Sequence, residues 1–281
     1  MTALPEDFEI VTVASGARTL RSRAHGETFH PVVGPMAEAR GLHVEQQRLV
    51  ERARATPGPF VVWDVGLGAA ANAVAVLEAF LDFGGPARIE LHSFDQTTAP
   101  LTFALTHAEA LAYVAPHRPA IAQLLAAGSV DLGPLRWTLH HGDFRGAMVG
   151  APAPHAILYD PYSPRANPEL WTLEHFTGVA ALLDPRRACL WSNYTRSTSV
   201  RVTLLLAGFF VGPGTATGEK EETTLASPAR ELLPALLDHT WLARVARSTA
   251  SAPLRPAGSA GPISAEDFAR LTAHPQFASA A

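Results

Sequence analysis

Four aspartates each follow a run of apolar and β-branched residues that is typical of a β-strand. They are Asp64, Asp95, Asp143 and Asp160. Because ligands of open α/β sheets bind outside the carboxyl ends of the strands, acids at these ends share one edge of the sheet. Carboxylates there can hold a cation, accept hydrogen bonds from sugar hydroxyls, or take a proton from a reacting group. The pattern therefore predicts a ligand site at this edge of the sheet.

A glycine-rich turn follows the first of these acids. Asp64 lies two residues before Gly66, and Gly68 precedes a helical stretch. A strand, a glycine-rich turn and a helix open many nucleotide-binding α/β domains, although Gly-x-Gly-x-x-Ala also fits the dinucleotide fingerprint. At position 64, dinucleotide-binding folds normally continue an apolar strand. A carboxylate there can face the amino group of S-adenosylmethionine, so it favours this cofactor over a nicotinamide cofactor. A tight turn without any ligand remains an alternative.

The next two acids extend this cofactor site. Asp95 closes the second strand, where its carboxylate can accept hydrogen bonds from ribose hydroxyls. Asp143 ends the third strand and can reach the amino group of an adenine. We therefore expect both residues, with the adjacent Phe144, to contact the cofactor.

The fourth acid opens the loop Asp160-Pro161-Tyr162, which is similar to the Asp-Pro-Pro-Tyr loop of amino methyltransferases. A nitrogen nucleophile must be neutral and aimed at the sulfonium methyl, so a carboxylate and a backbone carbonyl hold its hydrogens. The Tyr162 ring can stack on a planar acceptor. Alternatively, Asp160 only caps a turn before Pro161.

An N-terminal stretch, Arg23–Pro31, has the composition of a loop and carries Glu27, Phe29 and His30. Such a loop can cap a bound ligand, or it can be a solvated connection. The residues themselves leave both interpretations open.

The order of elements predicts the fold class. Strands alternate with helices through the centre, and two strands follow the fifth, which predicts a Rossmann-like α/β sheet of the class I S-adenosylmethionine-dependent methyltransferase type, mostly parallel with a reversed last strand. An N-terminal β-hairpin is expected over Asp7–Ser22. The expected helices are 35–55, 73–83, 100–114, 119–127, 167–183 with Asn167 as N-cap, 197–207, 232–245 and 264–273.

We expect three regions: residues 1–58 with hairpin, cap loop and helix; residues 59–227 as the methyltransferase domain; and residues 228–281 as a helical, partly mobile extension.

Composition argues against several other classes of protein. The single cysteine, Cys189, excludes an internal disulfide and a multi-cysteine zinc site, and it fits a reducing cytoplasm. His140 and His141 point to opposite faces of a strand, so a shared metal is not expected. Without a bilayer-spanning apolar run or a leader, we expect a cytoplasmic protein with no membrane partner. The formal net charge of -4 argues against strong general affinity for nucleic acid.

Taken together, these motifs resemble the methyltransferase domain of the bacterial tRNA 5-methylaminomethyl-2-thiouridine biosynthesis proteins and their stand-alone relatives. The most specific match is Asp160-Pro161-Tyr162-Ser163-Pro164 with Asn167-Pro168-Glu169-Leu170-Trp171. The other matching segments are 26–30, 64–68 with Asn72, 93–95, 142–143 and 218–221. The resemblance covers about Leu4 to Ser227.

The resemblance implies methylation of the aminomethyl group at C5 of the wobble uridine in tRNA with S-adenosylmethionine. In the two-domain members a flavin domain acts first, and because no second domain of that size fits in this sequence, we expect methyl transfer only, without flavin or metal. It implies a catalytic role for Asp160. The expected cofactor-binding residues are Asp64, Gly66, Gly68, Asn72, Asp95, Asp143 and Phe144. The expected substrate-binding residues are Glu27, Phe29, His30, Pro161, Tyr162, Trp171 and Lys220.

Three departures from the family pattern change the glycine-rich turn, the loop at Asp160 and the charge at 219–222, and the last of them bears on the choice of substrate. The turn that is Gly-Thr-Gly in the family is Gly68-Ala69-Ala70 here. In the loop that begins at Asp160, which we call the acid loop, Pro161 replaces a small residue and stiffens the backbone. At 219–222, acids replace the basic residues of the family. A small-molecule or peptide amine is therefore an alternative acceptor, and a nicotinamide oxidoreductase or a non-catalytic cofactor-binding scaffold are further alternatives. Phosphate binding would need cations near Asp160, for which the candidates are Arg165, Arg186, Arg187, Arg196 and Arg201.

Overall fold

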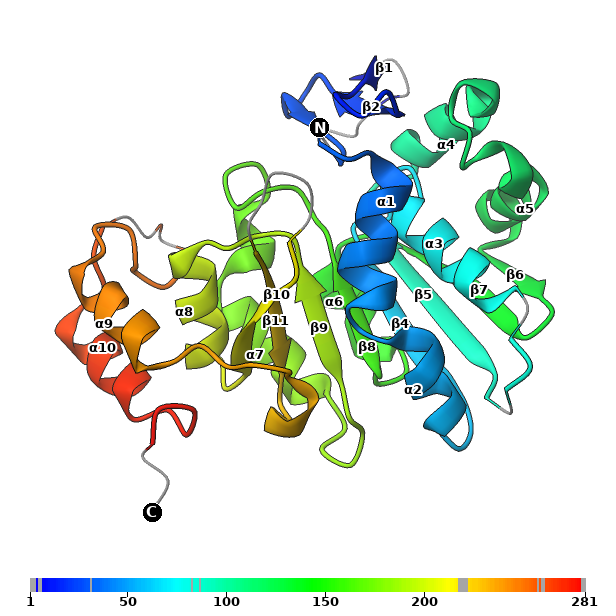
Figure 1. Ribbon diagram of the computed structural model, residues 1–281. Helices are drawn as coiled ribbons and strands as arrows, with labels where there is room; N and C mark the ends of the chain where they lie inside the picture. The colour runs from blue at the N-terminus through cyan, green and yellow to red at the C-terminus, as the bar shows by residue number, and fades with distance from the viewer. Residues whose placement is uncertain are drawn as a thin grey trace.

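A computed structural model describes residues 4, 7–30, 32–81, 83–85, 87–216, 222–256, 258 and 261–278 of the 281. A small antiparallel sheet near the N-terminus contains β1 (Phe8–Thr12), β2 (Arg18–Ser22) and the short β3 (Glu27–Thr28). The hairpin of β1 and β2 is the predicted one. In the view of Figure 1 it lies above a much larger sheet, from which it is separate.

The large sheet has eight strands in the order β10-β11-β9-β8-β4-β5-β7-β6. The central five strands are parallel, with β4 in the middle. The strands are β4 (Phe60–Val65), β5 (Ile89–Asp95), β6 (Ser129–Leu132), β7 (Leu135–His141), β8 (Ala156–Tyr159), β9 (Leu190–Asn193), β10 (Phe210–Gly214) and β11 (Thr223–Ser227). Because β11 runs antiparallel to both β9 and β10, the predicted reversed last strand is confirmed. The edge strand β6 was not predicted.

Helices cover both faces of this sheet and divide the core into two clusters. One cluster includes α1 (Pro35–Ala39), α2 (Leu49–Ala55), α3 (Ala71–Phe80), α4 (Ala99–Thr106) and α5 (Arg118–Ala127). The other includes α6 (Phe144–Ala147), α7 (Leu173–Leu182), α8 (Thr198–Leu206), α9 (His239–Arg247) and α10 (Ala265–Thr272). Because both faces are covered, every residue of the two innermost strands, β4 and β8, is buried, and Asp64 is the one charged residue in them.

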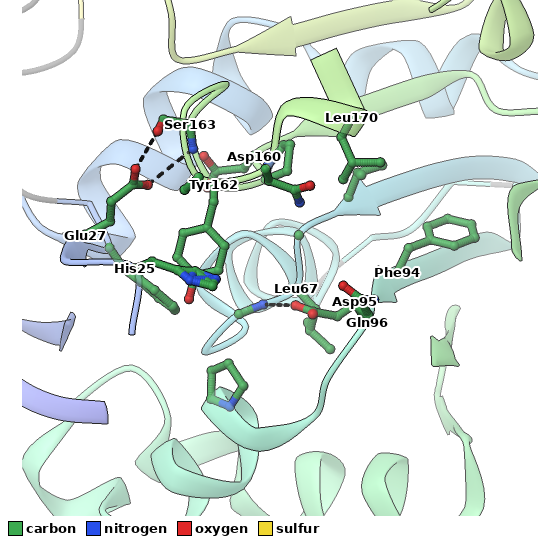
Figure 2. Close-up of a pocket in the computed structure, with 18 of the residues that line it drawn as sticks. His25, Glu27, Leu67, Phe94, Asp95, Gln96, Asp160, Tyr162, Ser163 and Leu170 are labelled. Atoms are coloured by element: carbon green, nitrogen blue, oxygen red, sulfur yellow. Dashed lines mark hydrogen bonds between the residues drawn. The ribbon is translucent and has the colours of Figure 1, made fainter. Parts of the chain in front are cut away.

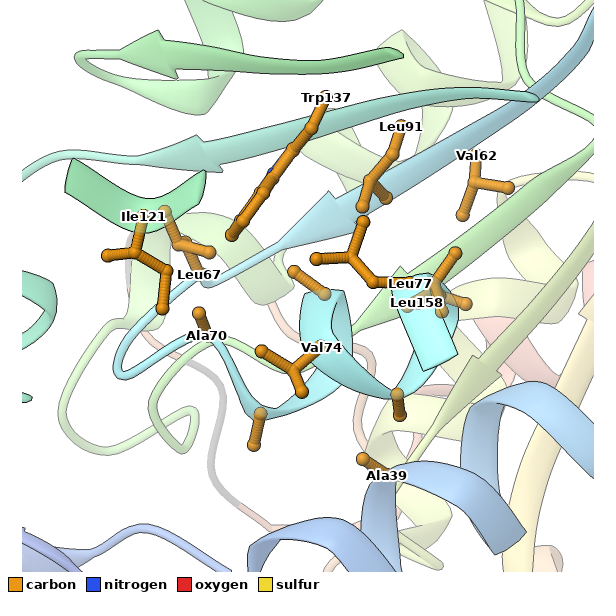
Figure 3. Packing of buried hydrophobic residues seen from close by; sticks show 14 of the residues in the cluster. Ala39, Val62, Leu67, Ala70, Val74, Leu77, Leu91, Ile121, Trp137 and Leu158 are labelled. Carbon is orange, nitrogen blue, oxygen red and sulfur yellow. The ribbon is translucent and has the colours of Figure 1, made fainter. Parts of the chain in front are cut away.

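The first cluster fixes the helix that follows the glycine-rich turn. Val74 and Leu77 of α3 pack toward Val62, Leu91 and Leu158 of the sheet, and all five are buried (Figure 3). Burying a side chain of this size contributes about 1.5–3 kcal/mol. The alanines of α3 let the helix approach its neighbours closely. The start of α3, and so the turn before it, is therefore held firmly in place.

The second cluster is aromatic and lies beneath the loop that follows β8. The Tyr159 ring contacts Trp171, Phe176 and Trp191 at centroid distances of 5.2, 5.9 and 4.4 Å. Such ring pairs contribute about 0.5–1.5 kcal/mol beyond their buried area. This packing fixes the direction in which the chain leaves β8.

The chain after Ser227 packs on the sheet. Leu271 and Phe277 are buried in the second cluster, and the Gln276 amide donates to the carbonyls of Val211 and Leu237. The region boundaries at 58 and 227 remain a proposal.

Several predicted helices are shorter than expected. The stretch 35–55 contains α1, a π-helical turn at Arg40–Glu45, and α2 after Arg48, whose φ is 52°. The helix expected over 100–114 ends at Thr106 and continues as short 3-10 turns. The stretch 232–245 is helical only from His239, because Pro234 cannot sit inside a helix.

The predicted N-cap Asn167 is wrong. Pro168–Trp171 is a 3-10 turn, and α7 begins at Leu173, where the Thr172 hydroxyl accepts a hydrogen bond from the His175 backbone N–H at 3.2 Å. Threonine is a favoured cap, and the sequence offered two competing cap sites five residues apart.

Candidate active site

A cavity of about 920 Å³ lies at the carboxyl ends of β4, β5, β7 and β8. Its lining comes from the turn after β4, the end of β5, the start of α6, the loop after β8 and the N-terminal stretch 25–30 (Figure 2). This is the sheet edge at which the sequence predicts a ligand site.

The glycine-rich turn brings backbone against backbone. Gly66 has a φ of 89°, and a Cβ there would lie 2.6 Å from the carbonyl oxygen of Asp160. The Asp160 backbone N–H in turn donates to the Val65 carbonyl at 2.9 Å. The acid loop therefore rests directly on the turn, and only glycine permits this approach.

The turn also contains a strained alanine. Ala70 is fully buried and has a φ of 65°, a left-handed conformation that costs a non-glycine residue roughly 1–2 kcal/mol. This is the position at which the family pattern has glycine. The chain thus keeps the left-handed backbone of the turn without the residue that favours it.

Asp95 closes the turn from the side of β5. Its Oδ2 accepts a hydrogen bond from the Gly68 N–H at 2.9 Å, and its Oδ1 accepts one from the Thr97 N–H at 3.1 Å (Figure 2). Burial raises the pKa of this carboxyl, and the backbone N–H groups oppose that rise. Each oxygen keeps a second lone pair for a hydroxyl from the cavity.

Asp64 does not line the cavity, which differs from the expectation that its carboxylate faces the ligand. It is fully buried, and its Oδ2 accepts a hydrogen bond from the Ser93 hydroxyl at 2.7 Å. Ser93 is itself held by the Trp137 indole N–H at 2.8 Å. Burial raises the pKa of Asp64 to about 7. The alternation of strand β4 places the side chain under the turn instead.

Asp143 and Phe144, at the start of α6, form another part of the cavity wall. Asp143 caps α6, where Oδ1 accepts from the Arg145 N–H at 3.0 Å, and its carboxylate also pairs with the Arg145 guanidinium. That guanidinium lowers the pKa of Asp143. Phe144 packs edge-on against Phe94 at 5.0 Å, and both rings border the cavity. They offer a flat apolar wall beside a hydrogen-bond acceptor.

Asp160 sits at the centre of the polar lining. Its Oδ2 accepts a hydrogen bond from the Asn72 amide at 2.9 Å and lies 3.9 Å from the His30 Nε2. The other ring nitrogen of His30 lies 3.8 Å from the Glu38 carboxylate. Glu38 was missed in the sequence, because nothing in its helical stretch marks it apart from other helical acids.

The N-terminal stretch 25–30 lies against the acid loop. The Glu27 carboxylate accepts hydrogen bonds from the Ser163 N–H at 3.2 Å and from the Ser163 hydroxyl. The Tyr162 ring packs against His25 at 4.2 Å and Phe29 at 5.6 Å. These contacts favour the interpretation of the stretch as a cap. His25 and Ser163 were not among the predicted site residues.

Trp171 does not line the cavity, although it was predicted to bind substrate. Its side chain is fully buried, and its indole N–H donates to the Tyr162 carbonyl at 2.8 Å. Trp171 thus supports the loop from behind. Lys220, also predicted as a substrate contact, lies outside the described residues.

Five arginines were candidates for binding phosphate near Asp160, and only some of them lie at this edge of the sheet. Arg201 is buried and bonds Glu222 and Thr224, while Arg186 and Arg187 precede β9 and so lie at its amino end. Arg165, in the acid loop, and Arg196, after β9, are the exposed arginines of the set at the carboxyl edge.

The lining is strongly acidic. It includes Glu27, Glu38, Asp95, Asp143, Asp160 and Glu169, and among the described residues no lysine or arginine lines it. Such a cavity attracts a cationic ligand. Within the described ranges no cluster of three or more metal-ligating side chains is present, and no helix there is long and apolar enough to cross a membrane.

S-adenosylmethionine fits these residues. Left-handed Gly66 and Gly68 form a close backbone approach, the Asp95 carboxylate has free acceptor capacity, and the buried Asn72 Oδ1 has no hydrogen-bond partner within the described chain. A sulfonium and an ammonium group match the acidic lining.

Comparison with known proteins identifies the family. Residues 108–229 match a family model described as S-adenosyl-L-methionine-dependent methyltransferase. The tRNA 5-methylaminomethyl-2-thiouridine biosynthesis bifunctional protein MnmC of Aeromonas hydrophila is 30% identical over 88% of the chain, and that of Ectopseudomonas mendocina is 29% identical over 88%. The chain spans 38% and 39% of the length of these two relatives.

A solved structure gives the same fold. MnmC2 from Aquifex aeolicus superposes with a TM-score of 0.68 at 22% identity, covering 97% of this chain and 85% of that one. The family match favours S-adenosylmethionine over a nicotinamide cofactor. The chain is therefore a class I S-adenosylmethionine-dependent methyltransferase, homologous to the methyltransferase portion of the MnmC proteins.

Proposed function

We propose that the chain methylates the aminomethyl nitrogen at C5 of the wobble uridine in tRNA. The observation that carries this proposal is the Asp160 carboxylate, held by Asn72 at 2.9 Å at the carboxyl end of β8 in an acidic cavity. An amine is the acceptor that such a lining attracts. The relatives are named for the biosynthesis of a methylaminomethyl uridine in tRNA.

The residues divide the work by their positions. S-adenosylmethionine supplies a methyl group activated by its positive sulfur. Asp160 accepts a hydrogen from the acceptor nitrogen and aims its lone pair, while Asn72 holds the carboxylate. Phe29 and Tyr162 offer aromatic rings for a planar base at the mouth, and the hydrogen bonds of Ser163 to Glu27 hold the N-terminal stretch against the loop after β8.

The distribution of charge limits how tRNA can bind. The described lining has six carboxylates and no lysine or arginine, so phosphate groups are repelled from the cavity. A flipped-out base with its alkylammonium group is neutral or cationic and can enter. The phosphates then rest outside, near the exposed Arg165 and Arg196. We include in this proposal that neither flavin nor metal takes part.

Nucleoside mass spectrometry of cells tests the proposal. In cells from which the gene is deleted, tRNA should lose the methylated nucleoside and accumulate 5-aminomethyl-2-thiouridine, and a plasmid copy should reverse both changes. Unchanged tRNA together with an accumulated small amine would instead place the acceptor among small-molecule or peptide amines.

A further inference from the structure

His30 bridges two carboxylates that come from different parts of the chain. Its Nε2 lies 3.9 Å from Asp160 Oδ2, and its Nδ1 lies 3.8 Å from Glu38 Oε2. The side chains of His30, Glu38 and Asp160 are 11, 8 and 18% exposed. At these separations, one water or a small side-chain rotation completes each contact. All three side chains belong to the lining of the cavity.

The backbone of His30 is strained. Its φ is 49°, a left-handed conformation that non-glycine residues rarely adopt and that costs about 1–3 kcal/mol. The neighbouring Phe29 is fixed by hydrogen bonds to Leu20 and Thr19 at 2.8 and 2.7 Å. The surrounding chain thus holds the imidazole between the two acids.

Methyl transfer to an alkylamine releases a proton. The ammonium form has no lone pair, so it must lose one proton before its nitrogen can attack. The Asp160 carboxylate can take that proton, but a protonated Asp160 must be emptied before the next turnover. The His30 imidazole also lines the cavity, and its Nε2 lies 3.9 Å from the Asp160 carboxylate, so it is a base placed to take this proton.

We propose that His30 receives this proton from Asp160 and that Glu38 is the positioning residue that makes His30 a good acceptor. The inference rests on the proposed amine acceptor. One N–H bond of the ammonium breaks, and Asp160 takes the proton. The amine nitrogen then forms its bond to the methyl carbon as the carbon–sulfur bond breaks. Asp160 passes the proton to His30 Nε2, and the imidazolium so formed lies between two carboxylates. Because His30 lines the cavity, the imidazolium returns the proton to solvent there when the product leaves.

The other ionisable groups around His30 fit this role. Burial lowers the pKa of His43 to about 3, with a smaller contribution from His30, so His43 stays neutral and does not compete for the proton. Burial and the acids Asp160, Glu27 and Glu38 raise the pKa of Tyr194, which keeps its hydroxyl protonated. The two carboxylates beside the imidazole, those of Glu38 and Asp160, favour its protonated form.

Histidine titration by NMR tests the arrangement without any substrate. We expect the protonation midpoint of His30, assigned by the loss of its signal in His30→Asn, to fall by roughly one pH unit in Glu38→Gln, because an anion near the imidazolium has been removed. Glu38→Asp keeps the charge and should recover most of the shift. Glu45→Gln, at an exposed acid seven residues after Glu38, is the matched control and should leave the midpoint unchanged.

The pH dependence of kcat gives the second measurement. In Glu38→Gln we expect kcat at pH 7 to fall about tenfold and its acid limb to move to lower pH with the His30 midpoint. Glu45→Gln should match the wild type. A purely structural role for Glu38 would lower activity equally at all pH values.

The outcomes separate this inference from the proposed function. If the His30 midpoint is the same in wild type, Glu38→Gln and Asp160→Asn, the inference is overturned, whatever the acceptor is. If the midpoint shifts but the tRNA is not methylated, the charge arrangement stands and the proposed acceptor fails. If wild type methylates the tRNA but the acid limb of the kcat–pH profile does not move in Glu38→Gln, the proton leaves by another route. The inference then fails while the proposed function stands.

Discussion

Asp64→Asn should make the stability of this protein less dependent on pH. The Asp64 carboxyl is fully buried, and its pKa is raised from 3.8 to about 7. A raised carboxyl pKa means that the unfolded chain ionises first, so this group lowers the free energy of unfolding as pH rises from about 4 to about 7. Asparagine has no such transition.

The magnitude follows from the two pKa values. Relative to the neutral form, ionisation of Asp64 costs the folded state about 1.7 kcal/mol at pH 5 and about 4.3 kcal/mol at pH 8. The difference, about 2.6 kcal/mol, should appear as a smaller loss of stability between pH 5 and pH 8 in Asp64→Asn than in wild type. The asparagine N–H₂ group adds a penalty for an unpaired donor, which is the same at both pH values.

Urea unfolding at pH 5 and pH 8 measures this difference directly. Asp131→Asn, at an exposed acid on β6, is the matched control and should behave as wild type within about 1 kcal/mol. Equal pH dependence of Asp64→Asn and wild type would refute the reasoning, because it would show that Asp64 is ionised in the folded protein at both pH values.

Three further changes follow from the geometry. Asp95→Ala removes the acceptor at the turn and should weaken S-adenosylmethionine binding by about 1.5–3 kcal/mol in calorimetry; an unchanged Kd would remove Asp95 from the cofactor site. Ala70→Gly relieves a left-handed alanine and should raise the free energy of unfolding by about 0.5–1 kcal/mol in urea, whereas lower stability would contradict the strain. Trp171→Phe loses the hydrogen bond to the Tyr162 carbonyl; it should raise the KM for the acceptor while leaving cofactor Kd unchanged, and the reverse pattern would argue against a loop-supporting role.

The sheet was predictable because its signals are local. Strands β4 and β8 are short apolar runs with an acid at or near the carboxyl end, and buried parallel strands have this pattern. Strands β5 and β7 mix apolar and polar residues, and a short turn follows each of them. The positions of Asp95, Asp143 and Asp160 at one edge follow from strand direction alone. The edge strand β6 escaped because its four residues lie between two turns and pair only with the adjacent β7.

The side chains behind the cavity were less predictable. Residue type and spacing place Asp64 and Trp171 near the site but do not say which way each points. Strand alternation turns Asp64 under the turn, and the 3-10 geometry at Pro168–Trp171 turns Trp171 inward. Glu38 reaches His30 only through long-range packing of α1. The binding and catalytic roles of the predicted site residues remain predictions.

The proposed acceptor is tested most directly with purified protein, S-adenosylmethionine labelled in its methyl group, and tRNA bearing 5-aminomethyl-2-thiouridine. Nucleoside mass spectrometry should find the label on the aminomethyl nitrogen. Asp160→Asn should bind the cofactor within a few-fold of wild type and reduce turnover by about 10²–10⁴. Undiminished methylation by Asp160→Asn, or no label on this nucleoside with wild type, would contradict the account.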